Sequence, residues 1–237
     1  MRRSLICCFA AALFCIAQSK EVRFGPNNAF RLECGKDVTT ANECPGVMEG
    51  TKLYPLPQST LDSYIRLRTA DIKRNPISAT SGQYLREEFI GPYQIEGNRL
   101  WFGNSFYDNE GWRGVGAFGY FDPSARRYEM FSPPEIARYE IKAILVEPDK
   151  VWLGLDRSIE DISPEPGGFA EWNRTTHAIH RYDVEFEVSK IERSGDALRL
   201  TSIGGYAIFR DGRITRYKTE NGETVAVERF PPLPSHY

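Results

Sequence analysis

The sequence repeats itself at intervals of about fifty residues. The stretch 98–128 begins with NRLWFG and, after an irregular insert, ends with GVGAFGYFDPSARRY. Its two halves recur within 149–183 as DKVWLGL and GGFAEWNRTTHAIHRYD, and a third copy, DALRLTSIGGYAIFRDGRITRY, occupies 196–217. Aligned on Leu100, Val151 and Leu198, the copies lie 51 and 47 positions apart. A period of this length predicts supersecondary units that each need neighbours to bury their apolar surface.

Each copy has the pattern of a small antiparallel sheet. Short apolar runs alternate with Gly, Asp-Pro, Asp-Gly and Asn-Gly breakers, which is typical of strands joined by tight turns. We expect an inner strand (93–95, 141–146 and 185–191), a turn, a second strand bearing Trp or Leu, a third strand opened by glycine, and a fourth ending in Tyr. The glycines Gly116, Gly168 and Gly205 would allow close backbone approach. The sequence therefore predicts an all-β, propeller-like array of four-stranded antiparallel blades.

The pattern D-x-x-W-x-G, a gap, G-G-x-aromatic and then R-Y-D resembles the blade repeat of periplasmic two-component-regulator propellers. It is more distantly similar to gluconolactonase-like and other bacterial propellers of six to eight blades. The resemblance covers about 84–229 and departs from the family where Arg199 replaces Trp101 and Trp152. Three clear copies are too few for a closed ring. Either a degenerate blade is built from 52–92 and the tail 223–232, giving four or five blades, or the chain forms an open arc that needs a partner.

The N-terminus predicts export. Arg2 and Arg3 precede the apolar run 5–17, which has the length of a signal-peptide core and is short for a bilayer span. Cleavage after Ala17 and cleavage after Ser19 both fit, whereas bulky Phe14 disfavours a lipoprotein site at Cys15. Later apolar runs are interrupted by charge and glycine, so we expect no membrane span in the mature chain and a periplasmic or secreted protein.

Cysteine usage agrees with export. Only Cys34 and Cys44 remain after the signal, and an oxidising compartment favours a disulfide between them, worth about 2–3 kcal/mol; half of a zinc site is the weaker alternative. The expected organisation is a signal peptide at 1–19, then an irregular N-terminal segment with the disulfide loop and a possible degenerate blade at 20–83. Propeller-like repeats at 84–232 and a disordered tail at 233–237 follow.

Two polar inserts interrupt the blades at one equivalent point, between the second and third strands, at 104–114 and 156–166. In a propeller this connection opens onto the face that carries the links between blades, so both inserts would enlarge one rim. Trp and Arg carry binding energy out of proportion to their number; ordinary solvated loops are the alternative. The predicted ligand-binding residues are Tyr107, Asp108, Glu110, Trp112, Arg113, Asp156, Arg157, Glu160 and Asp161.

No recurrent catalytic set accompanies the repeat. There is no Gly-x-Ser-x-Gly elbow, and His177 and His180 would point to opposite faces of a strand. Lys plus Arg (30) nearly balance Asp plus Glu (32), which gives no field for nucleic acid. We therefore predict no catalytic residue, metal, cofactor or nucleic-acid partner. The hypothesis is an exported, non-catalytic binding or scaffolding protein for an unknown protein or small molecule. The alternative is a metal-assisted hydrolase or lyase of gluconolactonase-like type, acting on a lactone or sugar derivative.

Overall fold

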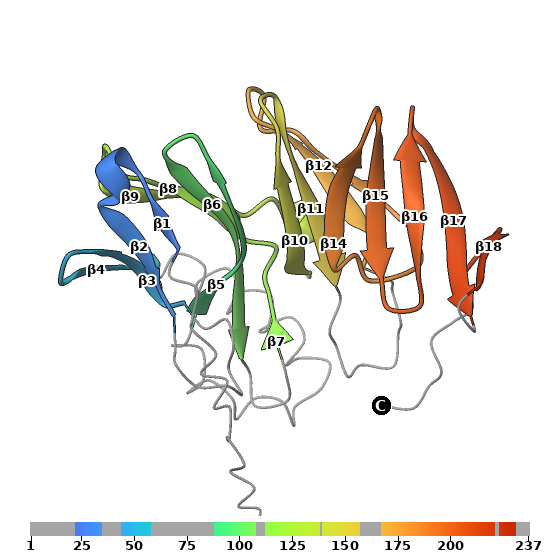
Figure 1. The fold of residues 1–237 in the computed structure, drawn as a ribbon, viewed down its shortest axis with the longest axis horizontal. Coiled ribbons are helices and arrows are strands. Elements are labelled where there is room, and N and C mark those ends of the chain that lie inside the picture. The colour runs from blue at the N-terminus through green and yellow to red at the C-terminus, as the bar shows by residue number, and fades with distance from the viewer. Residues whose placement is uncertain are drawn as a thin grey trace, which may run out of the picture.

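The computed structural model describes residues 22–34, 44–57, 88–107, 112–137, 139–156, 167–220 and 223–230. They form four separate antiparallel sheets of four or five strands, in which the strand order follows the chain (Figure 1). The first sheet contains β1 (Arg23–Phe24), β2 (Phe30–Glu33), β3 (Gly46–Glu49) and β4 (Lys52–Pro55). The second contains β5 (Glu88–Glu96), β6 (Arg99–Tyr107), β8 (Phe118–Asp122) and β9 (Arg127–Phe131), with β7 (Trp112–Arg113) paired to β6.

The third and fourth sheets complete the array. The third contains β10 (Glu140–Val146), β11 (Lys150–Asp156), β12 (Phe169–Asn173) and β13 (Ile179–Tyr182). The fourth contains β14 (Lys190–Ser194), β15 (Ala197–Ser202), β16 (Gly205–Arg210), β17 (Arg213–Glu220) and β18 (Glu223–Val227). Two short 3-10 turns, η1 (Pro26–Asn28) and η3 (Pro134–Ile136), lie in connections. The predicted all-β array of antiparallel sheets is confirmed.

The repeat in sequence is a repeat in strand register. Trp101, Trp152 and Arg199 are each the third residue of the second strand of their sheet. Trp101 and Arg199 pair two residues before the end of the inner strand, whereas Trp152 pairs one residue before it, because the hairpin turn of the third sheet is longer. The partners on the inner strands are Gln94, Leu145 and Glu192. Residues about fifty positions apart therefore occupy matching places.

One inner strand differs from its predicted limits. Residues 183–189 are not strand, and β14 begins at Lys190. This segment crosses from the third sheet to the fourth, and its backbone bonds to the third sheet: Gly168 donates its N–H to the carbonyl of Phe186 at 3.0 Å. Its apolar residues Val184, Phe186 and Val188 are buried between these sheets, which explains why the segment looks like strand in the sequence.

The N-terminal segment is more regular than expected. Residues 22–57 hold the first sheet, whose strands have only two to four residues and are separated by Gly, Pro and Asn, so their alternation is weak in sequence. The described parts of the proposed blade from 52–92 and the C-terminal tail belong to three different sheets, with β4 in the first and β5 in the second. From the tail, β18 pairs with β17 as the fifth strand of the fourth sheet. The predicted signal peptide and residues 231–237 lie outside the described residues.

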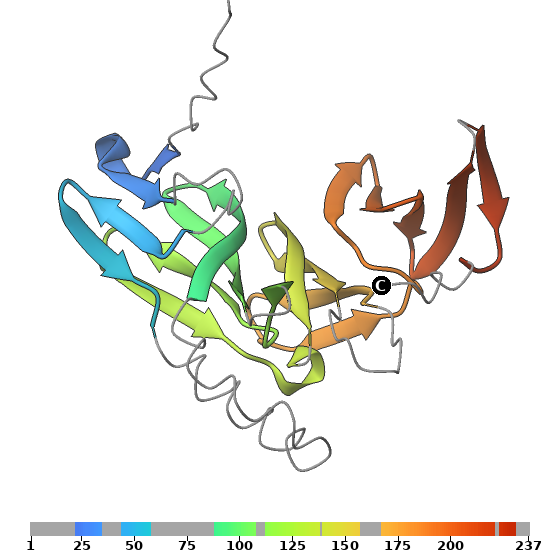
Figure 2. The ribbon, with the colours of Figure 1, turned by 90° about the horizontal axis from the view of Figure 1, so that it is seen from below.

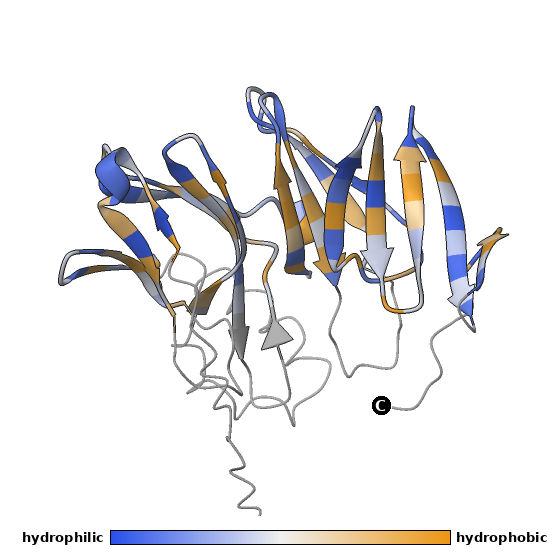
Figure 3. Cartoon of the chain, viewed as in Figure 1, coloured by the Kyte–Doolittle hydropathy of each residue, from blue (hydrophilic) through white to orange (hydrophobic). Residues whose placement is uncertain are grey.

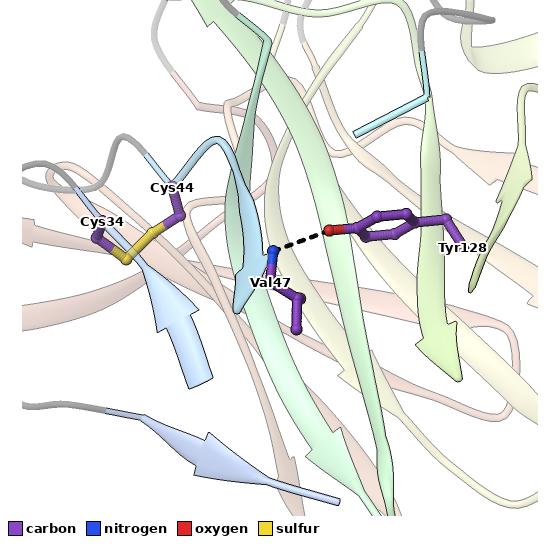
Figure 4. The surroundings of a disulfide bond; sticks show 4 residues. All are labelled: Cys34, Cys44, Val47 and Tyr128. Carbon is purple, nitrogen blue, oxygen red and sulfur yellow. Dashed lines mark hydrogen bonds between the residues drawn. A yellow bond between two sulfur atoms is a disulfide. The ribbon is translucent and has the colours of Figure 1, made fainter. Parts of the chain in front are cut away.

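The predicted disulfide between Cys34 and Cys44 is present (Figure 4). It ties the end of β2 to the residues that lead into β3. The carbonyl of Cys44 also accepts a hydrogen bond from the N–H of Ile90 in β5, at 2.8 Å. The bridge therefore stabilises the edge at which the first sheet meets the second.

The apolar core lies between the sheets. Leu100 and Trp101 are neighbours on β6, yet Leu100 packs in the cluster shared with the first sheet and Trp101 in the cluster shared with the third. A third cluster, with Trp152 and Leu198, joins the third and fourth sheets. Because successive side chains of a strand point to opposite faces, each inner sheet needs a neighbour on both sides. Figure 3 shows apolar residues interspersed along these strands.

The sheets follow one another along an open arc. Seen from below, the first and fourth sheets stand at opposite ends of it (Figure 2). Within the described part of the chain, no strand of the first sheet pairs with a strand of the fourth. The hairpin turns at 97–98, 147–149 and 195–196 share one end of the sheets, called here the turn end. The described connections, from β9 to β10 and from β13 to β14, and the ends of β6 and β11 where the two inserts begin share the other end, which we call the link end (Figure 1).

Candidate functional site

The first predicted insert begins as an extension of β6. Tyr107 pairs in register with Trp112, and Phe106 with Arg113, so the backbone returns as a narrow antiparallel ribbon beyond the body of the second sheet. This fixes the backbone of three predicted binding residues at the link end. Asp156 is the last residue of β11, at the start of the second insert. The other five predicted residues lie outside the described residues: Asp108, Glu110, Arg157, Glu160 and Asp161.

A charged cluster lies at the base of both inserts. The Nζ atom of Lys142 is 2.9 Å from Oε2 of Glu140 and 3.9 Å from Oδ2 of Asp156. Ser105, near the end of β6, also faces Glu140, and its side chain acts to lower the pKa of that carboxyl. We call Ser105, Glu140, Lys142 and Asp156 the anchor cluster. It joins the starting points of both inserts through two residues of β10.

A bulge in β10 positions this cluster. The register of β10 against β11 shifts between Ile141 and Ala143, so Lys142 is the extra residue and has no partner in the ladder. Bulges of this kind redirect a side chain without ending the strand. Ile141 and Ala143 are buried in the clusters on the two sides of the third sheet. Lys142 can thus turn toward Glu140 and Asp156 while the strand keeps its apolar contacts.

The electrostatics of the anchor cluster are set by burial. Glu140 is 4% exposed, and burial raises the pKa of its carboxyl although the charge of Lys142 opposes the shift. Burial lowers the pKa of the Lys142 ammonium, but the Glu140 carboxylate outweighs it and the pKa is raised. Glu187, in the link between the third and fourth sheets, also has a raised pKa, from burial and then from the charge of Asp156. Three carboxyls therefore surround one ammonium group.

Sequence reasoning missed Glu140, Lys142 and Glu187. The sequence feature that could have revealed Glu140 and Lys142 is EIKAILV at 140–146. Charged residues inside an apolar inner strand must find partners when the strand is buried. Perturbed pKa values mark functional sites and structural ion-pair networks alike. Here the geometry indicates a positioning role: the cluster holds the two insert bases together and places excess negative charge beneath them.

The histidine pair lies elsewhere. His177 is in the turn after β12 with a φ of 58°, and its ring stacks on Trp172 with 5.0 Å between centroids. His180 is on β13 and packs edge-on against Tyr182. Throughout the described ranges, no group of three or more His, Cys, Asp or Glu side chains is placed to hold a metal ion. Nor does any helix in those ranges have the length and apolar character needed to cross a membrane.

Comparisons with known proteins give a distant structural likeness. The sequence matches no protein-family model and no curated protein. Among solved structures, it is similar to the extracellular domain of BT4673, a protein from B. thetaiotaomicron assigned as a one-component system. The match has 13% sequence identity and a TM-score of 0.38, and covers 51% of this chain and 14% of that chain. So distant a likeness transfers no ligand or activity. The class is defined by the chain's own sheets: an all-β, propeller-like array of four repeated antiparallel sheets, open at both ends among the described residues.

Proposed function

We propose that this chain is an exported, non-catalytic binding or scaffolding protein whose recognition surface is the rim made by the inserts 104–114 and 156–166. The observation that carries the proposal is the anchor cluster. Through Glu140 and Lys142, it connects Ser105 at the base of one insert with Asp156 at the base of the other. Two polar inserts that start from one point can present their side chains to one ligand.

The chemistry of the rim favours a positively charged partner. Of its nine predicted residues five are acidic and two are arginines. The anchor cluster below adds the carboxylate of Glu140, which is paired with the ammonium group of Lys142. Trp112 and Tyr107 would supply the apolar contact that gives such an interface its affinity. Complementary charge would speed the encounter and fix the orientation of the partner.

The disulfide supports an extracytoplasmic location. Disulfides persist in oxidising compartments and are rare in the reducing cytosol. The bond between Cys34 and Cys44, taken with the predicted signal peptide, favours the periplasm or the cell exterior. With a formal net charge of −2, the protein also has no general attraction for nucleic acid.

The rim is tested with the double substitution Trp112→Ala/Arg113→Ala. Partners are captured from an envelope extract with wild-type and variant protein, and binding of any recovered partner is then titrated with both. The double Ala variant is expected to lose the partner while keeping the unfolding midpoint of the wild type. The matched control is Arg127→Ala/Thr175→Ala, two exposed residues at the turn end, which should keep it. Equal binding by wild type and the Trp112→Ala/Arg113→Ala variant would refute the rim.

The hydrolase alternative has no specific observation in its favour. It predicts a stoichiometric divalent ion and turnover of a lactone or sugar ester. Elemental analysis of the purified protein and an assay across lactones and esters test it directly, and a positive result in both would replace the binding proposal.

A further inference from the structure

The second and third sheets offer the same pair of groups to the sheet that follows. In the second sheet Nε1 of Trp101 donates to Oε2 of Glu96 at 3.4 Å, and in the third Nε1 of Trp152 donates to Oε2 of Glu147 at 2.8 Å. In both, the glutamate precedes the tryptophan by five positions across the hairpin turn. We call this the carboxylate–indole pair.

Each carboxylate–indole pair receives an arginine from the next sheet. Arg174, after β12 of the third sheet, donates from Nη1 to Oε1 of Glu96 at 3.0 Å, and its guanidinium lies 4.9 Å from the ring centroid of Trp101. Arg193 of β14 in the fourth sheet donates from Nε to Oε1 of Glu147 at 2.8 Å. In both contacts, therefore, one sheet supplies the carboxylate and the sheet that follows it supplies the guanidinium.

The fourth sheet reverses this chemistry. The repeat places Ser194 where the earlier sheets have glutamate, and Arg199 where they have tryptophan. The guanidinium of Arg199 lies 4.0 Å from the ring centroid of Tyr206, and that ring stacks on Tyr217 with centroids 4.8 Å apart. At this position the outward face of the fourth sheet therefore presents a guanidinium where the second and third sheets present a carboxylate with an indole; the Glu192 carboxylate opposite Arg199 in register is paired with Lys190.

This outward face is a shaped surface of mixed character. Strand register puts Arg199, Ile208 and Thr215 in one row across the sheet. A hollow of about 710 Å³ lies on it, lined by Ser194, Ala197, Ile208, Arg210, Asp211, Arg213, Thr215 and Tyr217. Arg210 is paired with Asp196 at 2.9 Å. Within the described residues Arg199 and Arg213 take part in no ion pair, so two cations remain available to an occupant.

A second copy of the chain does not fit this face by charge. The exposed end of another copy would be the outward face of its first sheet, where Arg23 lies opposite Arg31 in register, followed by Met48 and Leu53. That row holds arginines and apolar side chains and no carboxylate, so packing it on the fourth sheet would bring no acidic group to Arg199 and Arg213. A second copy is therefore not the occupant that the charges of this row favour.

We infer that the outward face of the fourth sheet is a docking surface for a protein partner that presents carboxylates alternating with apolar side chains. The matching face of the second and of the third sheet is covered by a protein sheet, through apolar contacts together with an arginine–carboxylate contact. The fourth sheet keeps apolar side chains on this face, at Ile208, Tyr206 and Tyr217, and has arginine where the earlier sheets have tryptophan, so its occupant should reproduce the sheet-like packing and bring the carboxylates. This surface is separate from the insert rim.

A synthetic peptide in which glutamate alternates with valine tests the inference, because a period of two places all its carboxylates on one side of a strand. Binding to the full chain is followed by the NMR signals of the Arg199 Nε–H group and the Tyr206 ring. The expected result is saturable binding that falls about tenfold or more in Arg199→Glu/Arg213→Glu, since reversed charges repel. Arg199→Gln/Arg213→Gln removes the two charges without reversing them and should show an intermediate loss of peptide binding. This variant replaces Arg199→Glu/Arg213→Glu in the test if the latter does not fold.

Control variants and other ligands distinguish the proposed acidic partner from other occupants of this face. Arg23→Glu/Arg31→Glu makes the same charge change on the first sheet and should bind the peptide normally, as should Trp112→Ala/Arg113→Ala on the rim. A peptide alternating lysine with valine should not bind. The inference is overturned if the glutamate peptide does not bind, if the Arg23→Glu/Arg31→Glu control loses binding equally, or if polygalacturonate binds this face and the peptide does not. Self-association of the wild type that Arg199→Glu abolishes would overturn it as well.

Discussion

The carboxylate of Glu147 holds Trp152 of its own sheet and Arg193 of the next sheet at once. The indole donates at 2.8 Å to Oε2, and the guanidinium Nε donates at 2.8 Å to Oε1. Burial raises the pKa of Glu147, but the hydrogen bonds from Arg193 and Trp152 outweigh burial and hold the pKa below its ordinary value. One side chain thus links the folding of one hairpin to the stacking of two sheets.

Glu147→Gln should lower the free energy of unfolding by about 1 kcal/mol, because charge-assisted hydrogen bonds are stronger than neutral ones. Since the folded pKa is lowered, the charge stabilises the fold above pH 4.5 and ceases to do so as pH falls through the folded pKa. The difference between variant and wild type should therefore shrink in acid. Urea unfolding at pH 7 and pH 3 measures it. The control Glu192→Gln breaks an exposed pair with Lys190 and should change stability by less than about 0.5 kcal/mol.

Tyr128→Phe tests the junction between the first and second sheets. The Tyr128 hydroxyl donates to the carbonyl of Tyr54 at 2.6 Å and accepts from the N–H of Val47 at 3.0 Å (Figure 4). Burial raises the pKa of this hydroxyl, and Phe would leave two backbone groups without their partner, at a cost of about 2 kcal/mol. Tyr54→Phe, which removes only a partly exposed bond to Glu49, should cost less than about 1 kcal/mol. Equal losses in urea unfolding would contradict this assignment.

Sequence alone predicted the sheets where apolar alternation and turn chemistry agree, as at Trp101 and Trp152. It failed where packing overrode the local pattern. The first sheet was missed because its strands are too short to show a period, although Phe24, Phe30 and Val47 bury fully against β6 and β8 residues. The predicted strand 185–191 begins too early, because burial between the sheets demands apolar residues in the link, whose only bridge in the described residues is that of Glu187 with Gly168.

The candidate site was predictable only in part. The inserts are visible as polar interruptions of the repeat, and the predicted ligand-binding side chains on them stay a prediction. The anchor cluster depends on the bulge at Lys142, a backbone shift with no reliable sequence signature. On the outward face of the fourth sheet, the sequence shows only that Arg199 replaces tryptophan. The structure adds that arginines from neighbouring sheets pair with Glu96 and Glu147 at the equivalent positions of the earlier sheets.

Gly168→Ala should be among the more destabilising changes in the third sheet. Gly168 has a φ of 82°, and a Cβ atom there would lie 2.3 Å from the carbonyl oxygen of Tyr182. Left-handed backbone costs a residue other than glycine about 1 kcal/mol, and the clash with backbone raises the expected loss to about 3 kcal/mol. Gly195 has a φ of 61° with open space around it, so Gly195→Ala isolates the backbone cost. Thermal unfolding of both variants should differ clearly, and equal midpoints would mean that the close approach is not a constraint.

Acid should weaken the contact between the first two sheets. Hydrogen bonds from Arg126, and then from Tyr54, lower the pKa of Glu49 to about 2. A lowered folded pKa means that the stabilisation is complete above pH 4.5 and is lost as pH falls from 4.5 toward 2. Glu49→Gln should therefore be less stable than the wild type at pH 6 and should converge with it near pH 2. A stability difference that stays constant across this range would show that the Glu49 charge has no role.

The anchor cluster should behave as a coupled pair. Lys142→Met leaves Glu140 buried without its cation, and breaking one side of such a pair is costly, about 2 kcal/mol here because Lys142 is partly exposed. Burial already raises the folded pKa of Glu140, so the charged form opposes folding, and the penalty is absent in acid and grows as pH rises through that pKa. Lys142→Met should thus be close to wild type at pH 4 and clearly weaker at pH 8. Glu140→Gln/Lys142→Met removes both charges and should recover most of the loss at pH 8. Urea unfolding of the wild type, the two single variants and the double variant gives the coupling energy. Additive effects of the two substitutions would show that Glu140 and Lys142 act independently. The anchor cluster would then not connect the two inserts.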